Sequence, residues 1–559
     1  MRRPGKLVGK GVAIFASFIV IGLAAVPLFH AGLFPTIDNI SVVRLESMAK
    51  ELGRGQFPVR YASDLARGHG YMLFNYYAPL PFYSGALIRL ARVNLVGALK
   101  RTYLAAFVLG GMGIFALSAE FFGPLGGAVS SAFYAFSPFI GYDIYWRGGL
   151  GEAWAMSLTP WVLWCMYRGI RRQSPGDAVG AGIAWAAVLL SHNLTAYLSF
   201  PFVGVWALWW IWYFRRSLWY GVMSIVLGFG LAAFFWLPAF VDRGQVWVSY
   251  LQAGRDDLFK NFVWGTVRNV LFPTFIPMIT NWFAIFTPLV IYFLVRRYVR
   301  DPLLRGVAGV SAGLFALAAF LASGLSRPVW SALFPVMYIF QFPWRFLTMV
   351  TVFGAVLVGA VAVMPKRYRL AGSVILILLA VLVNWANFRP KTYEFVDRYL
   401  PEDPCGTSWG FEYIPTSVKT CLKTSWGKPY HIDSGDLQVT SFHESAMGVE
   451  LSTESTMGGT LQSARYYYPA WRASIDGQTA QITPSYPNGL MDVHVPSGSH
   501  TVRFELRETP LQRVSTIISG ATGIGILLFA GWELRRLFAR TKLSRRRPAG
   551  KAASAKRTV

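Results

Sequence analysis

Long runs of apolar residues alternate with short polar breaks over most of the chain. Each run has about 20 residues, the length that a helix needs to cross a bilayer. The pattern predicts a polytopic helical membrane protein of about 12 spans. The first runs lie at about 11–31, 75–93, 101–121 and 124–140, and the next run ends at the basic cluster 168–172. The later runs lie at about 177–191, 195–214, 218–240, 271–295, 303–323, 345–364, 370–387 and 513–534.

The first polar break, residues 34–83, is too polar to lie in lipid. Over Ser41–Leu52 its apolar residues recur at helical spacing, with charged residues between them. This pattern is typical of a helix that lies flat on a membrane surface. Asp38 precedes the helix, where a carboxylate can cap the first turn or act as a general base.

The one long polar block is 388–512, and it alternates in the manner of β-strands. Val502, Phe504 and Leu506 alternate with charged residues, and Asp476-Gly477 is a hairpin turn signal. A small antiparallel sandwich is the expected packing. We therefore expect a transmembrane domain at 1–387, an extracytoplasmic β-rich domain at 388–512, a last helix at 513–534 and a basic tail at 535–559.

The distribution of charged residues predicts how these parts are oriented in the membrane. The formal net charge is +26, yet block 388–512 holds ten basic and 14 acidic residues, and the remaining basic residues gather in short clusters between apolar runs. By the positive-inside rule, the clusters and both termini are cytoplasmic and the block is outside. The chain is expected in the inner (cytoplasmic) membrane, and the placement of the charge argues against nucleic-acid binding. Cys405 and Cys421 then lie where a disulfide persists.

The charge rule also constrains the three runs between residues 75 and 140. The polar stretches on either side of them, 34–83 and 141–152, must lie on the same side of the membrane. An even number of crossings is required, so one of the three runs is a partial, re-entrant or surface element. The sequence leaves open which one.

Unusual polar residues gather on the outer side in this threading. Ionisable groups at membrane depth are costly and mark functional cavities. They are Asp38, Arg44, Arg60, Tyr71, Tyr76, Tyr77, Asp143, Arg147, Glu152, His192 and Arg345. Each also has a structural explanation: a helix cap, an aromatic belt, a buried histidine, a snorkelling arginine or a surface ion pair. Their common side favours a site.

The order of several short motifs resembles a known family. It comprises D-x(5)-R at 38–44, GQFPVR, GY…YYAPLPFY, YWRGGLGE, SHN and QFPWRF. Together they resemble the GT-C type integral-membrane glycosyltransferases, and more closely the prokaryotic membrane proteins catalogued as 6-pyruvoyl-tetrahydropterin synthase-related. The C-terminal YYPAWRASIDG…VPSGSHTVRFEL resembles the external β domain of such membrane proteins.

The resemblance implies transfer of a sugar from a polyprenyl-phosphate-linked donor to an unidentified acceptor on the outer face, by inversion. Asp38, Asp143 and Glu152 are then the candidate catalytic carboxylates, with Asp38 as the base. The candidate substrate-binding residues are Arg44, Arg60, Tyr71, Tyr77, Arg147, His192 and Arg345. No cofactor is required, although Asp143 and Glu152 leave room for a divalent metal.

Two alternatives stay open at this point. One is a non-catalytic scaffold or assembly factor for surface glycan, and the other is a transporter of lipid-linked glycan. A transporter more typically shows pseudo-symmetric halves with broken helices. The concentration of polar residues in the first loop, far from the late β-rich block, favours an enzyme.

Overall fold

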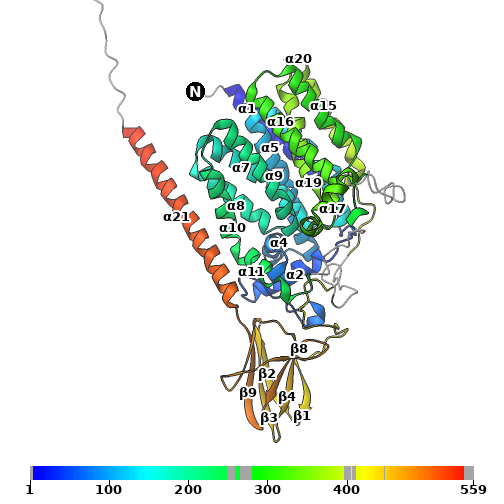
Figure 1. The fold of residues 1–559 in the computed structure, drawn as a ribbon, viewed down its shortest axis with the longest axis vertical. Coiled ribbons are helices and arrows are strands. Elements are labelled where there is room, and N and C mark those ends of the chain that lie inside the picture. The colour runs from blue at the N-terminus through cyan, green and yellow to red at the C-terminus, as the bar shows by residue number, and fades with distance from the viewer. Residues whose placement is uncertain are drawn as a thin grey trace, which may run out of the picture.

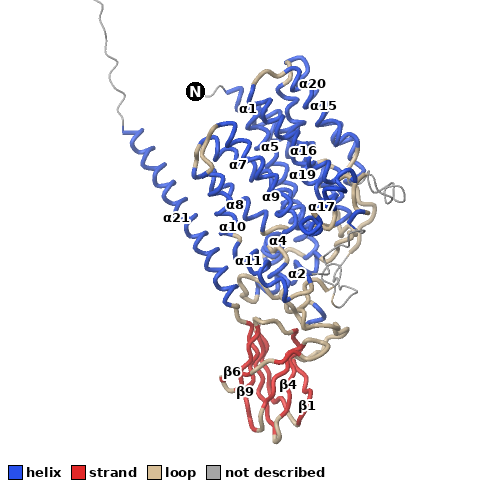
Figure 2. Tube along the Cα trace, viewed as in Figure 1, coloured by secondary structure: helices blue, strands red, loops and turns tan. Residues whose placement is uncertain are grey.

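Helices and strands occupy opposite ends of the molecule (Figures 1 and 2). The computed structural model describes residues 4–248, 258–264, 280–395, 405, 411–445 and 447–546. Residues 271–279 of one predicted span and 547–559 of the predicted tail lie outside the described residues. The N-terminus lies at the end of the helical bundle that points away from the strands (Figure 1).

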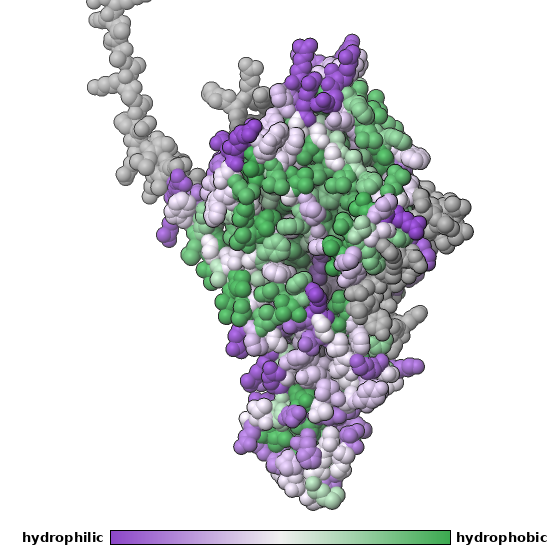
Figure 3. Space-filling view, in the orientation of Figure 1, coloured by the Kyte–Doolittle hydropathy of each residue, from purple (hydrophilic) through white to green (hydrophobic). Residues whose placement is uncertain are grey.

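The bundle consists of apolar helices. Figure 3 shows hydrophobic side chains across its visible face and hydrophilic ones over the strands and at the far end. The helices are α1 (Pro4–Ala24), α5 (Leu95–Ala135), α7 (Leu150–Arg172), α8 (Pro175–Leu189), α9 (Asn193–Phe214), α10 (Trp219–Leu231), α11 (Ala233–Val241), α15 (Trp282–Tyr298), α16 (Pro302–Ala322), α19 (Leu347–Gly359), α20 (Lys366–Asn384) and α21 (Pro510–Arg546).

The helices confirm a multi-pass membrane protein. Among the described residues, six helices are long and apolar enough to cross a membrane, and a bent pair makes up to seven. Two apolar helices, Gly9–Ala24 and Pro175–Leu189, are shorter. The count of about 12 spans stays a prediction.

Helix α5 is a hairpin of two arms. It breaks at Gly123, whose φ of 74° suits a residue without a side chain, and Pro124 follows. A Cβ on Gly111 would lie 3.3 Å from Ser131 Oγ, and one on Gly110 would lie 2.5 Å from the Tyr134 ring. The arms therefore run antiparallel, and they correspond to the predicted runs 101–121 and 124–140.

The run at 75–93 is the element that does not span. It forms the short helices α3 (Leu73–Tyr76) and α4 (Leu80–Leu90). The 11 residues of α4 extend about 16 Å, roughly half of a bilayer core. This assignment leaves the two arms of α5 between the two polar stretches, the even number that the charge rule predicts.

The predicted span at 218–240 is bent rather than straight. Helices α10 and α11 meet at Ala232 with a bend of 75°. The backbone N–H of Phe234, exposed by the break, donates to Ser519 Oγ of α21 at 2.8 Å. The partner helix thus satisfies a backbone group that the bend frees.

The predicted amphipathic helix of the first loop is α2 (Ser41–Gly53). Its apolar residues Val42, Leu45 and Met48 are buried, and so are Arg44 and Glu51. The helix packs against α4 and α5. It is therefore covered by protein on more of its surface than a helix lying on lipid would be.

The strands form the predicted antiparallel sandwich. One sheet has the order β1-β4-β8-β7 and the other β2-β3-β9-β5-β6. Val502, Phe504 and Leu506 are buried, and Asp476-Gly477 connects β5 to β6, as the alternation indicated. The strands are β1 (Tyr430–Gly435), β2 (Gln438–Ser445), β3 (Gly448–Ser455), β4 (Gly459–Tyr466), β5 (Trp471–Ile475), β6 (Gln478–Ala480), β7 (Thr483–Pro484), β8 (Leu490–Val495) and β9 (Gly498–Leu506).

The sandwich docks on the first loop. The ring nitrogens of His69 lie 2.6 Å from the Ala464 carbonyl and 3.1 Å from the Thr424 carbonyl. The hydroxyls of Tyr76 and Tyr468 are 2.7 Å apart. These buried hydrogen bonds hold residues 60–77 between the strands and the bundle.

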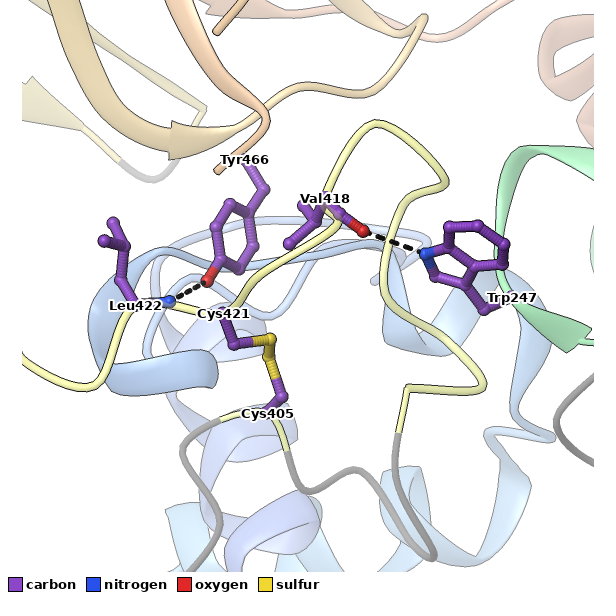
Figure 4. The surroundings of a disulfide bond; sticks show 6 residues. All are labelled: Trp247, Cys405, Val418, Cys421, Leu422 and Tyr466. Atoms are coloured by element: carbon purple, nitrogen blue, oxygen red, sulfur yellow. Dashed lines mark hydrogen bonds between the residues drawn. A yellow bond between two sulfur atoms is a disulfide. The ribbon is translucent and has the colours of Figure 1, made fainter. Parts of the chain in front are cut away.

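Cys405 and Cys421 form a disulfide beside this contact (Figure 4). Their Cα atoms are 6.0 Å apart. Nearby, the Leu422 N–H donates to the Tyr466 hydroxyl at 3.2 Å, and Trp247 Nε1 donates to the Val418 carbonyl at 3.0 Å (Figure 4). The bridge therefore closes a loop that contacts both β4 and the segment after α11.

Candidate functional site

The candidate site forms where the first loop meets the loop before α7. The Ile37 N–H donates to the Trp146 carbonyl at 3.0 Å, and the Asp38 N–H donates to the Arg147 carbonyl at 2.6 Å. Residues Tyr142–Arg147 form one π-helical turn, a conformation that is frequent at functional sites. Backbone pairing thus fixes Asp38 beside Arg147.

Arg147 is the centre of the site. Its guanidinium lies 2.8 Å from Asp143 Oδ1, 2.5 Å from Glu152 Oε2 and 3.4 Å from Asp38 Oδ2. The side chains of Asp143 and Glu152 are 0% and 1% exposed, whereas that of Asp38 is 25% exposed. Buried charges require such pairing, and Asp38 is the carboxylate of this group that meets solvent.

Arg345 completes the group from another part of the chain. It lies in the 3₁₀ turn Pro343–Phe346, with Nε 3.8 Å from Glu152 Oε2. The neighbouring Trp344 ring lies 5.2 Å from the Arg147 guanidinium carbon, within the range of a cation–π contact. We call Asp38, Asp143, Arg147, Glu152 and Arg345 the carboxylate–arginine cluster.

Several polar atoms of the cluster lack a hydrogen-bond partner within the described part of the chain. They are Asp143 Oδ2, Glu152 Oε1 and Arg345 Nη1, all buried. Buried polar groups are nearly always paired, so unpaired ones need an explanation. A bound polar ligand would supply partners for them.

The cluster holds three carboxylates and two guanidinium groups. Burial and the neighbouring Glu152 raise the pKa of Asp143 well above its usual range, although Arg147 opposes the shift. Burial lowers the pKa of His192 to about 3, so its ring beside the cluster is neutral.

His192 lies at the edge of the cluster and ends the loop before α9. Its Nδ1 accepts from the Thr195 N–H at 3.3 Å and lies 2.8 Å from Thr195 Oγ1. The ring is close to Glu152, whose charge acts on it. His192 therefore caps α9 as well as bordering the site.

Two residues that border the site, Tyr103 and Trp344, were not predicted from the sequence. Tyr103 donates its hydroxyl to the Gly148 carbonyl at 2.9 Å and is buried beside Asp38 and Asp143. It lies inside an apolar run, where a tyrosine carries no signal of its own. Trp344 was noted only as the neighbour of Arg345, because ring orientation cannot be read from spacing.

Three other predicted residues, all in the first loop, lie together and away from the cluster. The Arg44 guanidinium carbon lies 4.0 Å from the centre of the Tyr77 ring. Tyr77 in turn contacts Tyr413, with ring centroids 5.8 Å apart. Tyr71 is buried, and burial raises its pKa. Arg44, Tyr71 and Tyr77 hold the loop against residues 411–413 rather than joining the cluster.

Arg60 lies away from the carboxylate–arginine cluster. Its Nη1 donates to the Asn75 side chain at 3.1 Å and to the Phe234 carbonyl at 2.7 Å, and Nη2 donates to Thr516 Oγ1 at 3.1 Å. Glu508 lies 3.8 Å from its Nε. Arg60 thus ties the first loop to α11 and α21, and the structure does not bring it to the cluster.

The structure also bears on helix capping and metal binding. Helix α2 begins after Ile40, and no side chain caps it, so Asp38 is directed to Arg147 instead. In the ranges that the structure describes, no group of three or more His, Cys, Asp or Glu side chains is arranged to hold a metal ion. One oxygen each of Asp143 and Glu152 is engaged by Arg147.

Comparisons with known proteins cover most of the bundle. The family described as "6-pyruvoyl-tetrahydropterin synthase related domain; membrane protein" matches residues 74–390. An uncharacterized protein of Lactococcus lactis subsp. cremoris (strain MG1363) is 22% identical over 268 residues, which is 45% of this chain and 43% of the relative. The match therefore spans less than half of that relative's length.

Solved structures with a similar chain path include the following three. Arabinofuranosyltransferase AftD from Mycobacteria has a TM-score of 0.41 at 16% identity, over 68% of this chain and 27% of that one. ArnT from Cupriavidus metallidurans bound to undecaprenyl phosphate has 0.38 at 15%, over 66% and 62%. The Archaeoglobus fulgidus oligosaccharyltransferase, in complex with Zn and sulfate, has 0.40 at 13%, over 67% and 52%.

We predict that Gly149→Ala destabilises the protein by crowding the cluster. A Cβ at this position would lie 2.4 Å from Asp143 Oδ1 and 3.1 Å from Arg147 Nη1. Overpacking of this kind costs about 1–3 kcal/mol. The measurement is the thermal unfolding midpoint of the purified protein in detergent.

The matched control is Gly309→Ala, in the interior of α16, where an added Cβ meets nothing within 4 Å. Because alanine favours helix over glycine, the control should unfold at the same temperature or slightly higher. Equal midpoints for the two variants would show that the glycine does not shape the cluster.

Proposed function

The chain belongs to the 6-pyruvoyl-tetrahydropterin synthase related family of membrane proteins, and we propose that it is a glycosyltransferase. The donor is a sugar linked to polyprenyl phosphate, the acceptor is a hydroxyl on the outer face of the membrane, and the reaction inverts the anomeric centre. The observation that carries the proposal is one partly exposed carboxylate set against two otherwise buried arginines.

The proposed orientation follows from charge. The clusters Arg168–Arg172 and Arg215–Arg216 lie at the C-terminal ends of α7 and α9, whose N-terminal ends begin at the site. The positive-inside rule places that basic end, with both termini, in the cytoplasm of a cell with an inner membrane. The site and the sandwich then face outward, where lipid-linked sugars and surface glycans meet.

Asp38 is the proposed general base. The acceptor hydroxyl loses its proton to Asp38 as its oxygen bonds to the anomeric carbon of the donor. Asp38 suits this role because it is the most exposed carboxylate of the cluster, and because its backbone pairing and Arg147 hold it in place. The acceptor can therefore reach it without entering the buried part of the cluster.

The arginines are proposed to stabilise the leaving group. The bond between the anomeric carbon and the phosphate oxygen breaks, and the electron pair leaves on polyprenyl phosphate. Guanidinium groups bind phosphate oxygens in bidentate geometry and offset the developing charge. Arg345 suits this role because its Nη1 is buried without a hydrogen-bond partner among the described residues.

Asp143 and Glu152 are proposed as positioning residues. Both are buried against Arg147, and neither meets solvent as Asp38 does. They hold Arg147 between Asp38 and Trp344. His192 and Tyr103 border the same space and are proposed to orient the substrate.

The orientation predicts that residue 455, at the end of β3, is accessible from outside the cell. An introduced Ser455→Cys should react with a membrane-impermeant thiol reagent in intact cells, since the residue is partly exposed. The control is the parent protein, which has serine at position 455. Labelling only after lysis would contradict the orientation.

The central role of Asp38 predicts that Asp38→Asn abolishes transfer while leaving the fold intact. An amide keeps the size of the side chain but cannot accept the proton, and loss of a general base typically costs on the order of 10²–10⁴ in rate. The measurement is sugar transfer with extracted polyprenyl-linked sugar, at matched protein levels. Asp242→Asn is the control, because Asp242 lies after α11, outside the cluster.

Near-normal transfer by Asp38→Asn would remove Asp38 from the mechanism. Asp143→Asn and Glu152→Gln would then be measured in the same assay. Transfer that survives all three changes would contradict the catalytic role of these carboxylates. Absence of transfer by the parent protein would contradict the enzyme and favour a scaffold whose sandwich binds glycan.

A further inference from the structure

A basic cavity lies beside the end of α1. It has a volume of about 910 Å³ and is bounded by the segment Leu28–Gly32, the C-terminal end of α4 and the N-terminal turns of α5. Lys100 of its wall is one helical turn from Tyr103, whose hydroxyl donates to the carbonyl of Gly148, the residue after Arg147 of the cluster. The cavity therefore lies at the same end of the bundle as the cluster but does not include its residues.

The charge of the cavity is strongly positive. Arg89, Arg92, Lys100 and Arg101 line it together with a single carboxylate, Glu46. Arg89 is paired with Glu46 at 3.0 Å. For Arg92, Lys100 and Arg101, no carboxylate lies within ion-pair distance among the residues described. These three cations are therefore available to pair with a bound anion.

Lys100 is buried in the wall of the cavity. The residue is 5% exposed, and its Nζ donates to the His30 carbonyl at 2.6 Å. The His30 ring stacks on Tyr393 with centroids 3.8 Å apart. A buried ammonium without a carboxylate is costly, and an anion in the cavity would offset that cost.

The same cavity has an apolar side. Leu28, Phe29, Leu95 and Leu104 line it, and Phe29 is 70% exposed. Helix α1, which leads into the cavity, presents exposed apolar side chains such as Phe15 and Ile19. A ligand with an anionic head and an apolar chain matches both sides.

The position of these cations is unusual for the chain. The clusters at Arg168–Arg172 and Arg215–Arg216 lie at the opposite end of the bundle, in the last turns of α7 and directly after α9. Basic residues at the site end oppose the positive-inside bias. A basic cluster that opposes this bias points to a ligand, because topology alone would disfavour it.

We propose that the cavity binds the phosphate-bearing headgroup of an anionic membrane lipid. Arg92, Lys100 and Arg101 supply the charge that recognises the phosphate, and the apolar wall receives the start of the lipid chain. This proposal does not rest on the proposed glycosyl transfer, and it stands even where that transfer fails its test.

The experiment measures lipid bound to the full-length protein by native mass spectrometry, after release from nanodiscs of equal phosphatidylglycerol and phosphatidylcholine. Arg92→Gln combined with Arg101→Gln should weaken retention of phosphatidylglycerol on the order of tenfold. Both arginines are exposed, so folding should persist, and the unfolding midpoint checks it. The single variant Arg92→Gln should show a smaller loss in the same direction.

The matched control is Arg215→Gln combined with Arg216→Gln, which removes the same charge at the opposite end of the bundle. Its phosphatidylglycerol retention should stay within about twofold of the parent. An equal loss in the control, or none in the cavity variant, would overturn the proposal. So would displacement of the lipid by glycerol phosphate at the same concentration as by intact lipid, because the site would then take a soluble anion.

A competition arm identifies the source of the lipid phosphate. Displacement of phosphatidylglycerol by a lower concentration of polyprenyl phosphate would assign the cavity to the carrier. Retention of phosphatidylglycerol under the same conditions would assign it to a lipid of the bilayer. Both results support a lipid-phosphate site.

Discussion

One guanidinium group, that of Arg147, connects the parts of the site. It pairs with Asp38 from the first loop and with Asp143 and Glu152 around the start of α7. Because Glu152 is 1% exposed, removing its carboxylate leaves an uncompensated buried charge on Arg147, which typically costs about 3–5 kcal/mol. The position of the proposed base therefore depends on the buried carboxylates that hold Arg147.

The sandwich reinforces the same arrangement from the other side. His69 and Tyr76 of the first loop bond to residues 464 and 468, while Arg60 bonds to α11 and α21. The loop is thus fixed at the bundle, at the strands and at the last helix. Such fixation is what a site needs when its chemistry depends on placing a carboxylate beside the anomeric carbon of a membrane-borne donor.

Much of this arrangement follows from local pattern and from counting membrane crossings. The alternation around Phe504 indicates its strand, and the crossings place Asp38, Asp143 and Arg345 on one side. Arg60 could not be assigned in this way, because its partner Thr516 is 456 residues distant in sequence. The bend at Ala232 and the role of Tyr103 were also hidden, since both lie within apolar runs that look alike whether they cross lipid or line a site.

The most direct test of the account is the structure of the protein with a non-transferable polyprenyl-phosphate sugar bound. The account predicts the phosphate against Arg345 and Arg147, with the Asp38 carboxylate on the opposite side of the anomeric carbon, within reach of an acceptor hydroxyl. A sugar bound away from the carboxylate–arginine cluster, or with Asp38 on the phosphate side of the anomeric carbon, would contradict it.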